Sequence, residues 1–282
     1  MLPSDFELHR PATVEEATAL RTQLGDDAAL YAGGTELLLA MKLGVLDYGH
    51  LIDLKRIAAL RGVERRDGEL RIGALVTHRE LETDPEVARA LPALAALERN
   101  VANVRVRAAG TMAGNLAFAE PHADPPALLI ALGARVALAG AGGRRELPLE
   151  EFIAGPYETE LGEDELIEAV VVPVGDARAA YRKFQVLERP AVGVAAVGRV
   201  RDGVFDGEPV VVAGAVDERP VRIPAGELAG AARDDAHALD ALAAAAAEAV
   251  EPVDDLSGSE DYKRHLTGVL AKRAVLALGE TG

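Results

Sequence analysis

Two glycine-containing loops are the parts of this sequence whose residue types could bind a phosphate. The first loop, Ala32-Gly33-Gly34-Thr35, lies between an expected strand at 28–31 and an expected helix at 36–43. Successive glycines let backbone N–H groups converge and let a phosphate approach without a Cβ in the way. The start of the following helix adds further donors, including Glu36. An ordinary Gly-Gly turn remains the alternative interpretation.

The second loop has the same chemical character and reads Gly110-Thr111-Met112-Ala113-Gly114-Asn115. Thr111 and Asn115 offer side-chain donors, and Gly114 permits a close approach. Asp124 opens an expected helix at 124–132, where it either accepts from a sugar or ribityl hydroxyl or serves only as a helix cap. Two phosphate-type loops suit a ligand with two phosphates, such as a dinucleotide. Neither loop matches G-x-x-x-x-G-K-[ST] or G-x-G-x-x-G.

Other kinds of site are weakly supported. The six histidines are scattered without a metal-binding spacing such as H-E-x-x-H, and no G-x-S-x-G motif occurs. The chain has no cysteine, which excludes disulfides, cysteine-ligated zinc, an iron–sulfur cluster on this chain and a cysteinyl cofactor link. We therefore expect no metal site and no catalytic residue of the chain's own, and any redox chemistry needs an organic cofactor bound non-covalently.

Charge and hydropathy exclude several kinds of partner. The formal net charge is −16, which would repel nucleic acid and anionic lipid. No run of 18 apolar residues is present, so no membrane span is expected. The start, MLPSDFELHR, lacks the basic and apolar regions of a signal peptide. The sequence therefore predicts a cytoplasmic protein.

Hydrophobic periodicity and capping residues predict three groups of elements. The first group alternates strands at 6–8, 28–31 and 51–54 with helices that begin at Thr13 and Glu36, as in a small parallel unit. The second group has strands at 69–74, 135–138, 144–147 and 165–172, and helices at 84–101 and 124–132. The third group has strands at 180–187, 193–200 and 209–216, and helices at 240–250 and 262–278. We place a domain boundary near residue 176.

The two loops and their flanks resemble the FAD-binding medium subunit of molybdenum hydroxylases, the carbon monoxide dehydrogenase and xanthine dehydrogenase flavoprotein family. The resemblance runs from about Phe6 to Leu278. It is carried in order by FELHRPATVEEATAL, YAGGTELLLAMKLG, LIDLKRIAALRGV, LRIGALVTHREL, VRAAGTMAGNLAFAEPHADPPALLIALGARV and DELIEAVVVP. The pair formed by AGGT and the GT-x-x-GN loop is the most specific part.

The resemblance implies an α+β fold. A bilobal FAD-binding domain of the PCMH/vanillyl-alcohol-oxidase type would span residues 1–175, with lobes at about 1–55 and 56–175. A domain of the CO dehydrogenase flavoprotein C-terminal type, with three antiparallel strands and a helix bundle, would span 176–282.

The resemblance also implies which residues contact the cofactor. Non-covalent FAD would have its pyrophosphate held by Ala32, Gly33, Gly34, Thr35 and Glu36, and by Thr111, Met112, Ala113, Gly114 and Asn115. Asp124 would contact the sugar-like part of the flavin, Ile167 would make a backbone contact, and Lys183 would lie close to the flavin. A solvated lysine on an edge strand is the alternative for Lys183.

Three positions depart from the family pattern, and one of them is Ala108, which replaces a frequent asparagine. Ala113 stands where a glycine is usual, so this peptide needs a negative φ or carries strain. Val192 stands in a stretch, Arg189–Gly193, that lacks the usual acidic-aromatic pair, and one flavin face is expected to be less covered.

The implied function is electron transfer. A small subunit with [2Fe-2S] clusters and a large subunit with the molybdenum cofactor would pass electrons to FAD and on to an external acceptor, in a dimer of heterotrimers. The identity of the acceptor and of the substrate stays open. Two alternatives are a self-contained FAD-dependent oxidoreductase acting on a small molecule and a non-catalytic adaptor with the same fold.

Overall fold

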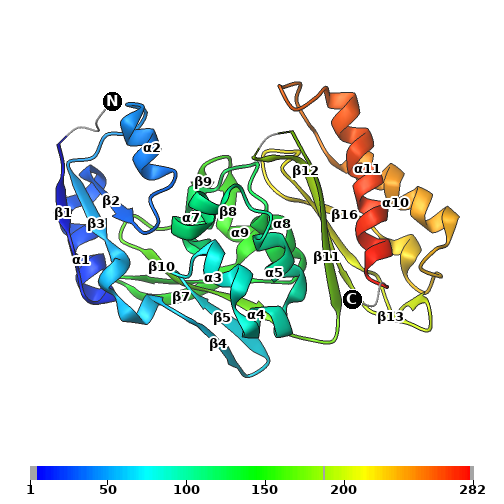
Figure 1. Cartoon of the computed structure of the whole chain (residues 1–282), viewed down its shortest axis with the longest axis horizontal. Helices are drawn as coiled ribbons and strands as arrows, with labels where there is room; N and C mark the ends of the chain where they lie inside the picture. Colours follow the sequence, from blue (N-terminus) through cyan, green and yellow to red (C-terminus); the bar gives the residue numbers. More distant parts are fainter. Residues whose placement is uncertain (1–4, 187, 280–282) are drawn as a thin grey trace.

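The first lobe is a three-stranded parallel sheet in the order β1-β3-β2 (Figure 1). The computed structural model describes residues 5–186 and 188–279. The strands are β1 (Glu7–His9), β2 (Ala28–Tyr31) and β3 (His50–Asp53), joined through α1 (Val14–Leu24) and α2 (Leu37–Lys42). The Thr13 hydroxyl caps α1 by accepting from Glu16 N at 3.1 Å, as the sequence predicts, but the Glu16 carboxylate accepts from Ala12 N instead of Thr13 N.

The second lobe is a five-stranded antiparallel sheet with helices gathered on one side (Figure 1). Its strand order is β4-β5-β10-β6-β7, so β10, the last of these strands in the chain, lies in the middle. The strands are β4 (Val63–Arg66), β5 (Glu69–Gly73), β6 (Arg135–Gly140), β7 (Gly143–Pro148) and β10 (Leu166–Pro173), and a small hairpin is formed by β8 (Ile153–Gly155) and β9 (Glu158–Thr159). The helices are α3 (His78–Thr83), α4 (Pro85–Ala90), α5 (Pro92–Glu98), α6 (Val104–Ala109), α7 (Met112–Phe118), α8 (Pro125–Ala131) and α9 (Leu149–Phe152).

The second lobe differs from the sequence analysis at two places. The single helix expected from Asp84 to about Val101 is divided into α4 and α5, because Pro92 disfavours a helical conformation at Leu91, which has φ −136° and ψ 65°. The stretch 104–109, which the sequence analysis assigned to no element, forms helix α6 under a cap from Asn103.

The last part of the chain is a four-stranded antiparallel sheet covered by two helices. Its strands are β11 (Arg178–Gln185), β12 (Pro190–Gly198), β15 (Val210–Gly214) and β16 (Val221–Ile223), the helices are α10 (Ala236–Ala249) and α11 (Glu260–Ala277), and a minor hairpin joins β13 (Val200–Arg201) to β14 (Val204–Phe205). The sequence predicted three strands, and β16 was missed because three residues give too short a pattern. The expected strand at 180–187 ends on Leu187, which lies outside the described residues. Among the described residues, no helix is both long and apolar enough to cross a membrane.

Helix α8 of the second lobe packs against this last sheet and forms a contact between the two parts. All seven of its residues are buried, and it packs against β12 and β15. A Cβ at Gly214 on β15 would lie 2.9 Å from Ala127 Cβ, so the glycine permits the close contact. The opposite face of the same sheet packs on α10 and α11, which leaves β12 apolar on both faces.

Candidate functional site

A cavity of about 740 Å³ lies where the two lobes meet the C-terminal sheet. This volume is within the range of about 300–1,000 Å³ that is typical of ligand pockets. The pocket wall includes these residues predicted from the sequence: Ala32, Gly33, Gly34, Thr35, Glu36, Thr111, Gly114, Asn115 and Asp124. The two predicted loops, far apart in sequence, are therefore brought together around one pocket.

The first loop is held tightly by the protein around it. A Cβ at Gly33 would lie 2.2 Å from the carbonyl oxygen of Ala109 in the second lobe. Gly34 has φ +73°, and its Cβ would lie 2.3 Å from the ring of Tyr31. The two glycines were predicted to leave room for a ligand, but protein atoms fill the space beside each Cα. Gly33 lets the first loop reach the second lobe, and Gly34 lets the chain turn closely against Tyr31 of the first lobe.

A lysine that the sequence did not single out lies behind this loop. Lys55 Nζ is 3.3 Å from the centroid of the Tyr31 ring and donates a hydrogen bond to the Ala32 carbonyl oxygen at 3.2 Å. The ammonium group also pairs with Asp53 at 2.9 Å. A cation is thus fixed against the backbone of the predicted phosphate loop.

The second loop is largely helical, which corrects the prediction. Thr111 is the N-cap of α7, and its hydroxyl accepts from Gly114 N at 3.1 Å. The Met112 amide donates to Val76 O at 3.0 Å, and the Met112 side chain is completely buried. Ala113 is nearly buried within α7 and has no positive φ, so it carries no backbone strain there. The N-terminal end of α7 therefore replaces a glycine loop at this wall.

Asn115 provides the clearest sign that the pocket receives a polar ligand. Its side chain lines the pocket, and its Oδ1 atom is buried without a hydrogen-bond partner among the described residues. A buried amide oxygen without a partner costs about 1–3 kcal/mol. A ligand N–H or O–H group in the pocket would remove this cost.

Asp124 does not cap helix α8, since its side chain makes no capping hydrogen bond. One carboxylate oxygen accepts from Tyr181 Oη at 2.9 Å, and the other accepts from Lys183 Nζ at 2.9 Å. Burial raises the pKa of Asp124, and the Lys183 charge only partly opposes this. Burial and the Asp124 charge hold the pKa of Tyr181 well above its ordinary value. The carboxylate that lines the pocket is thus fixed in place from the C-terminal sheet.

Four of the predicted residues are not part of the pocket wall: Met112, Ala113, Ile167 and Lys183. Ile167 is buried in β10, paired with Leu138 of β6. Lys183 lies on the edge strand β11 but is only 13% exposed, so the interpretation as a solvated lysine was wrong. It contacts the pocket through Asp124 and also donates to Asn100 O at 2.8 Å.

The stretch around Val192 differs from expectation. Val192 is completely buried and faces α10 and α11, so it is not available to cover a flavin. Arg189 and Pro190 line the pocket instead. Arg189 pairs with Glu120 of the second lobe and, at 3.2 Å, with Glu36 of the first loop. One side chain from the segment just before β12 therefore bridges both lobes across the pocket.

Glu120 is the centre of this bridge. Its carboxylate also accepts from Tyr157 Oη at 2.9 Å and lies 3.1 Å from His122 Nδ1. Burial raises the pKa of Glu120, but the hydrogen bonds from His122 and Tyr157 and the Arg189 charge outweigh burial and lower the pKa from 4.5 to about 2. Sequence reasoning missed this group because Tyr157 and Arg189 are 37 and 69 positions from Glu120 in the chain.

We expect Glu120 to make the free energy of unfolding depend on pH in the acid range. A pKa that is lower in the folded than in the unfolded protein stabilises the fold fully above about pH 4.5, and this contribution is lost as pH falls toward about 2. With allowance for solvent screening, it is on the order of 1–2 kcal/mol. Urea unfolding at pH 6 and pH 3 should show that Glu120→Gln loses stability at pH 6 but much less at pH 3. Exposed Glu151→Gln is the matched control, and a Glu120→Gln deficit equal at both pH values would contradict the expectation.

A second buried acid–base pair was also missed. His78 lines the pocket, and its Nδ1 lies 2.6 Å from Oε2 of the completely buried Glu98. Burial lowers the pKa of His78, but the charge and hydrogen bond of Glu98 outweigh this and raise the pKa above its ordinary value. The chain thus places a protonatable imidazole in the pocket wall. The capping box of Thr77 and Glu80 is the only sequence signal nearby, and it positions α3.

Two of the six non-glycine residues with positive φ in the described part of the chain lie at the pocket. Ala102 and Tyr157 both line it, and both have positive φ values, 39° and 59°. Such conformations cost of order 1–3 kcal/mol and persist where the surroundings impose them. Together with the unpaired Asn115 oxygen, they mark the cavity as a site built for a ligand.

Two lobes enclose one pocket, and a small antiparallel sheet completes its wall, which is the arrangement of a two-lobed ligand-binding protein of the α+β class. Residues 4–175 match the family model described as the FAD binding domain in molybdopterin dehydrogenase. Residues 178–278 match the CO dehydrogenase flavoprotein C-terminal domain. The chain therefore belongs to the family of FAD-binding subunits of molybdopterin dehydrogenases, and it is an oxidoreductase subunit.

Individual relatives agree with this assignment. The chain is 37% identical to the carbon monoxide dehydrogenase medium chain of Hydrogenophaga pseudoflava, with 98% of each chain covered. It is 30% identical to the nicotine 6-hydroxylase medium subunit of Paenarthrobacter nicotinovorans, with 95% of each covered. The solved structure of quinoline 2-oxidoreductase from Pseudomonas putida 86 superposes with a TM-score of 0.93 at 30% identity, covering 99% of this chain and 98% of that chain. The expected fold class and FAD cofactor are thereby confirmed.

Proposed function

We propose that this chain holds FAD in the pocket between its lobes and transfers electrons from partner iron–sulfur clusters to an external acceptor. The unpaired Oδ1 of Asn115 at the pocket wall supports the binding of a polar ligand here, as an acceptor for a ligand O–H or N–H group and not for its phosphates. The pyrophosphate would lie between Ala32–Glu36 and Thr111–Asn115, where both loops meet. FAD, when bound, supplies the redox chemistry, and the chain supplies position and electrostatics.

The chain's own residues have separate roles in this proposal. Backbone amides of the first loop and of the α7 N-terminus bind the phosphates, with Lys55 supplying positive charge behind the first loop. Asp124, fixed by Tyr181 and Lys183, accepts from a hydroxyl of the sugar-like portion. Ile167, on β10, would make its contact with the cofactor through the backbone. Arg189 closes the pocket and excludes water from one side.

We further propose two domains, 1–175 and 176–282, with the first divided into lobes at about residue 55. The first two sheets share no strand, and the C-terminal sheet is also separate, which supports this division. The pocket lies where the three sheets adjoin.

The partner subunits must hold the metal centres, because this chain has no cysteine. We propose a small subunit with [2Fe-2S] clusters and a large subunit with the molybdenum cofactor, assembled in the cytoplasm as a dimer of heterotrimers. An apolar surface beside the pocket supports docking: Leu39, Leu43 and Val45 are 50%, 69% and 73% exposed. Neighbouring Leu37 and Leu46 line the pocket itself, so a subunit bound there would lie close to the cofactor.

The electron-transfer proposal is tested by comparing the isolated chain with the reconstituted complex under anaerobic conditions. We expect the isolated chain to bind one FAD and to show negligible bleaching of its flavin by the substrate of the complete enzyme. In the complex, the substrate should bleach the flavin within one catalytic turnover. Dithionite reduction of both samples is the control that the flavin itself is redox-active.

Two outcomes would contradict parts of this proposal. Bleaching of the isolated chain by substrate at the rate of the complex would favour a self-contained oxidoreductase. Purified protein without visible flavin absorbance, and unable to take up added FAD, would favour an adaptor. Acid precipitation should leave the flavin in the supernatant as FAD, because no cysteinyl link is possible.

A further inference from the structure

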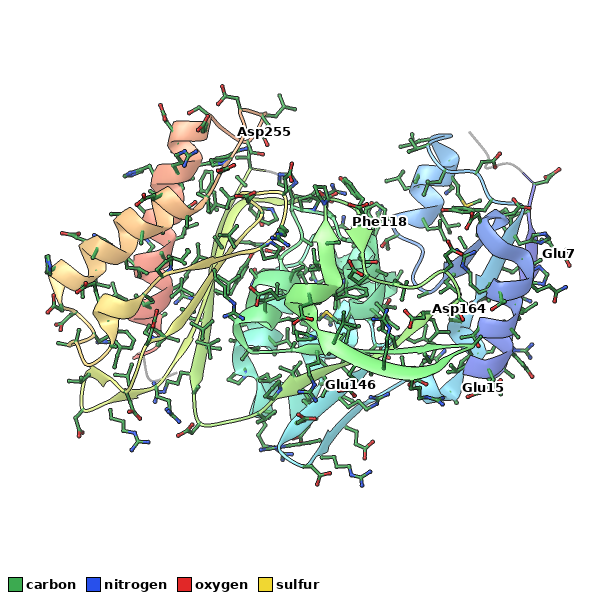
Figure 2. The ribbon with its side chains drawn as sticks, turned by 180° about the vertical axis from the view of Figure 1, so that it is seen from behind. Glu7, Glu15, Phe118, Glu146, Asp164 and Asp255 are labelled. Atoms are coloured by element: carbon green, nitrogen blue, oxygen red, sulfur yellow. The ribbon has the colours of Figure 1, made fainter. Side chains whose placement is uncertain are left out.

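Outside the pocket, Glu7, His9 and His50 form a cluster at the edge of the first lobe, here called the edge cluster. His9 Nε2 lies 3.1 Å from His50 Nδ1, and Glu7 Oε2 lies 3.6 Å from His50 Nδ1 and 4.0 Å from His9 Nε2. None of the three residues lines the pocket. Figure 2 shows Glu7 on the outer border of the molecule, and the His9 and His50 side chains are 19% and 25% exposed.

Strand pairing brings the three residues together. Glu7 and His9 are two positions apart on β1, so both point to the same face of the sheet. Parallel pairing with β3 places His50 directly beside Glu7. The two histidines are 41 positions apart in the chain, which is why their sequence spacing gave no metal signal.

The donor atoms have the separations that a small cation requires. Two ligands about 2.0–2.1 Å from a tetrahedral zinc ion lie roughly 3.3 Å apart. The edge cluster offers two imidazole nitrogens and one carboxylate oxygen within 4.8 Å of one another. Imidazole and carboxylate ligands suit first-row divalent ions such as Zn²⁺.

The surroundings of His50 complete this arrangement. If His50 binds through Nδ1, its Nε2–H faces Asp27 Oδ2 at 3.9 Å. The other oxygen of Asp27 accepts from Gly49 N at 2.9 Å, which fixes the carboxylate. Metal-binding histidines commonly have a carboxylate beside the second ring nitrogen, where it orients the imidazole and increases its basicity. Asp27 occupies that position.

We propose that the edge cluster is a binding site for a first-row divalent cation of the Zn²⁺ type. His9 Nε2, His50 Nδ1 and Glu7 supply three ligands, and water takes the fourth position. No bond is made or broken in a substrate, so the role is structural. The ion ties the three-residue strand β1 to β3 and leaves the flavin pocket untouched. A simple hydrogen bond between the two imidazoles is the competing explanation for their contact.

The test uses the full chain loaded with FAD, with any affinity tag removed and the protein dialysed against a chelator. Calorimetric titration with zinc chloride at pH 7.5 should show one saturable equivalent. His50→Asn and His9→Asn should abolish this binding, and Asp27→Asn should weaken it roughly 10- to 100-fold. Magnesium chloride should give no saturable signal, because Mg²⁺ prefers a shell of oxygen ligands.

His265→Asn is the matched control, since His265 is exposed on α11 and should leave zinc binding unchanged. Circular dichroism and flavin content of each variant establish that it is folded, and Glu7→Gln, at a 68% exposed position, gives a milder test of the same site. Absence of a saturable zinc equivalent in the wild type would overturn the proposal. Equal zinc affinity in the wild type and in folded His50→Asn would overturn it as well, and would leave the imidazole hydrogen bond as the explanation.

Discussion

Gly33→Ala is expected to weaken FAD binding roughly 10- to 100-fold while most of the protein stays folded. The new Cβ would lie 2.2 Å from the Ala109 carbonyl oxygen and 2.9 Å from Gly110 Cα, and neither backbone can move away easily. Overpacking of this kind costs about 1–3 kcal/mol. If the clash destabilises mainly the flavin-bound conformation, this cost corresponds to the expected roughly 10- to 100-fold loss of FAD affinity. Titration of deflavinated protein with FAD, followed by quenching of flavin fluorescence, measures the change.

Gly142→Ala provides the matched control. Gly142 lies between β6 and β7, and a Cβ there meets nothing within 4 Å. Gly34→Asp is a poorer test, because φ +73° and the contact with Tyr31 would strain the loop before any charge effect appeared. Wild-type FAD affinity in Gly33→Ala would mean that the first loop does not hold the cofactor.

Lys183→Met is expected to destabilise the fold by about 3–5 kcal/mol. Lys183 supplies the positive charge beside Asp124, whose side chain is only 4% exposed. Methionine has a similar length but leaves the carboxylate with Tyr181 as its remaining side-chain partner. Removal of one partner from a buried ion pair leaves an uncompensated charge, which costs more than the pair contributes. Urea unfolding with the cofactor removed measures the loss without a contribution from FAD binding.

Lys272→Met is the control for this change, because Lys272 pairs with Asp240 on the surface, where that carboxylate is 73% exposed. We expect its loss to be at most about 1 kcal/mol. The double variant Lys183→Met with Asp124→Asn should recover part of the stability. Equal losses for the two lysine variants would show that the Asp124 pair behaves as a surface pair.

Elements with strong local signals were predicted well from the sequence. Strand β2 was predicted at its observed bounds, and Thr13 and Asp84 cap the starts of helices as expected. The exceptions have local physical causes. Pro92 interrupts a long helical pattern, and the Thr111 cap turns a glycine-rich stretch into the first turn of a helix.

The sequence predicted the two loops of the pocket wall but not the residues that bridge the lobes, because that bridge depends on contacts between residues far apart in the chain. Arg189 is separated from Glu120 by 69 positions and from Glu36 by 153, and no local pattern connects such residues. Successive side chains of β12 point to opposite faces of the sheet, which explains why Val192 does not lie at the pocket, where the sequence placed it. Gly193 leaves space for the Tyr181 hydroxyl, while Val192 faces the helices, and one position along a strand decides between these surroundings.

The ion pairs of Arg189 with both lobes also affect when the pocket can be completed during synthesis of the chain. The first phosphate loop emerges early in synthesis, whereas β10, the central strand of the second lobe, and Arg189 emerge long afterwards. Domains fold as they emerge, starting from the N-terminus. The nascent chain therefore exposes an unfinished pocket through most of its translation. Under the proposed role of Arg189 in closing the pocket, we expect flavin loading to be complete only after the C-terminal sheet has been made.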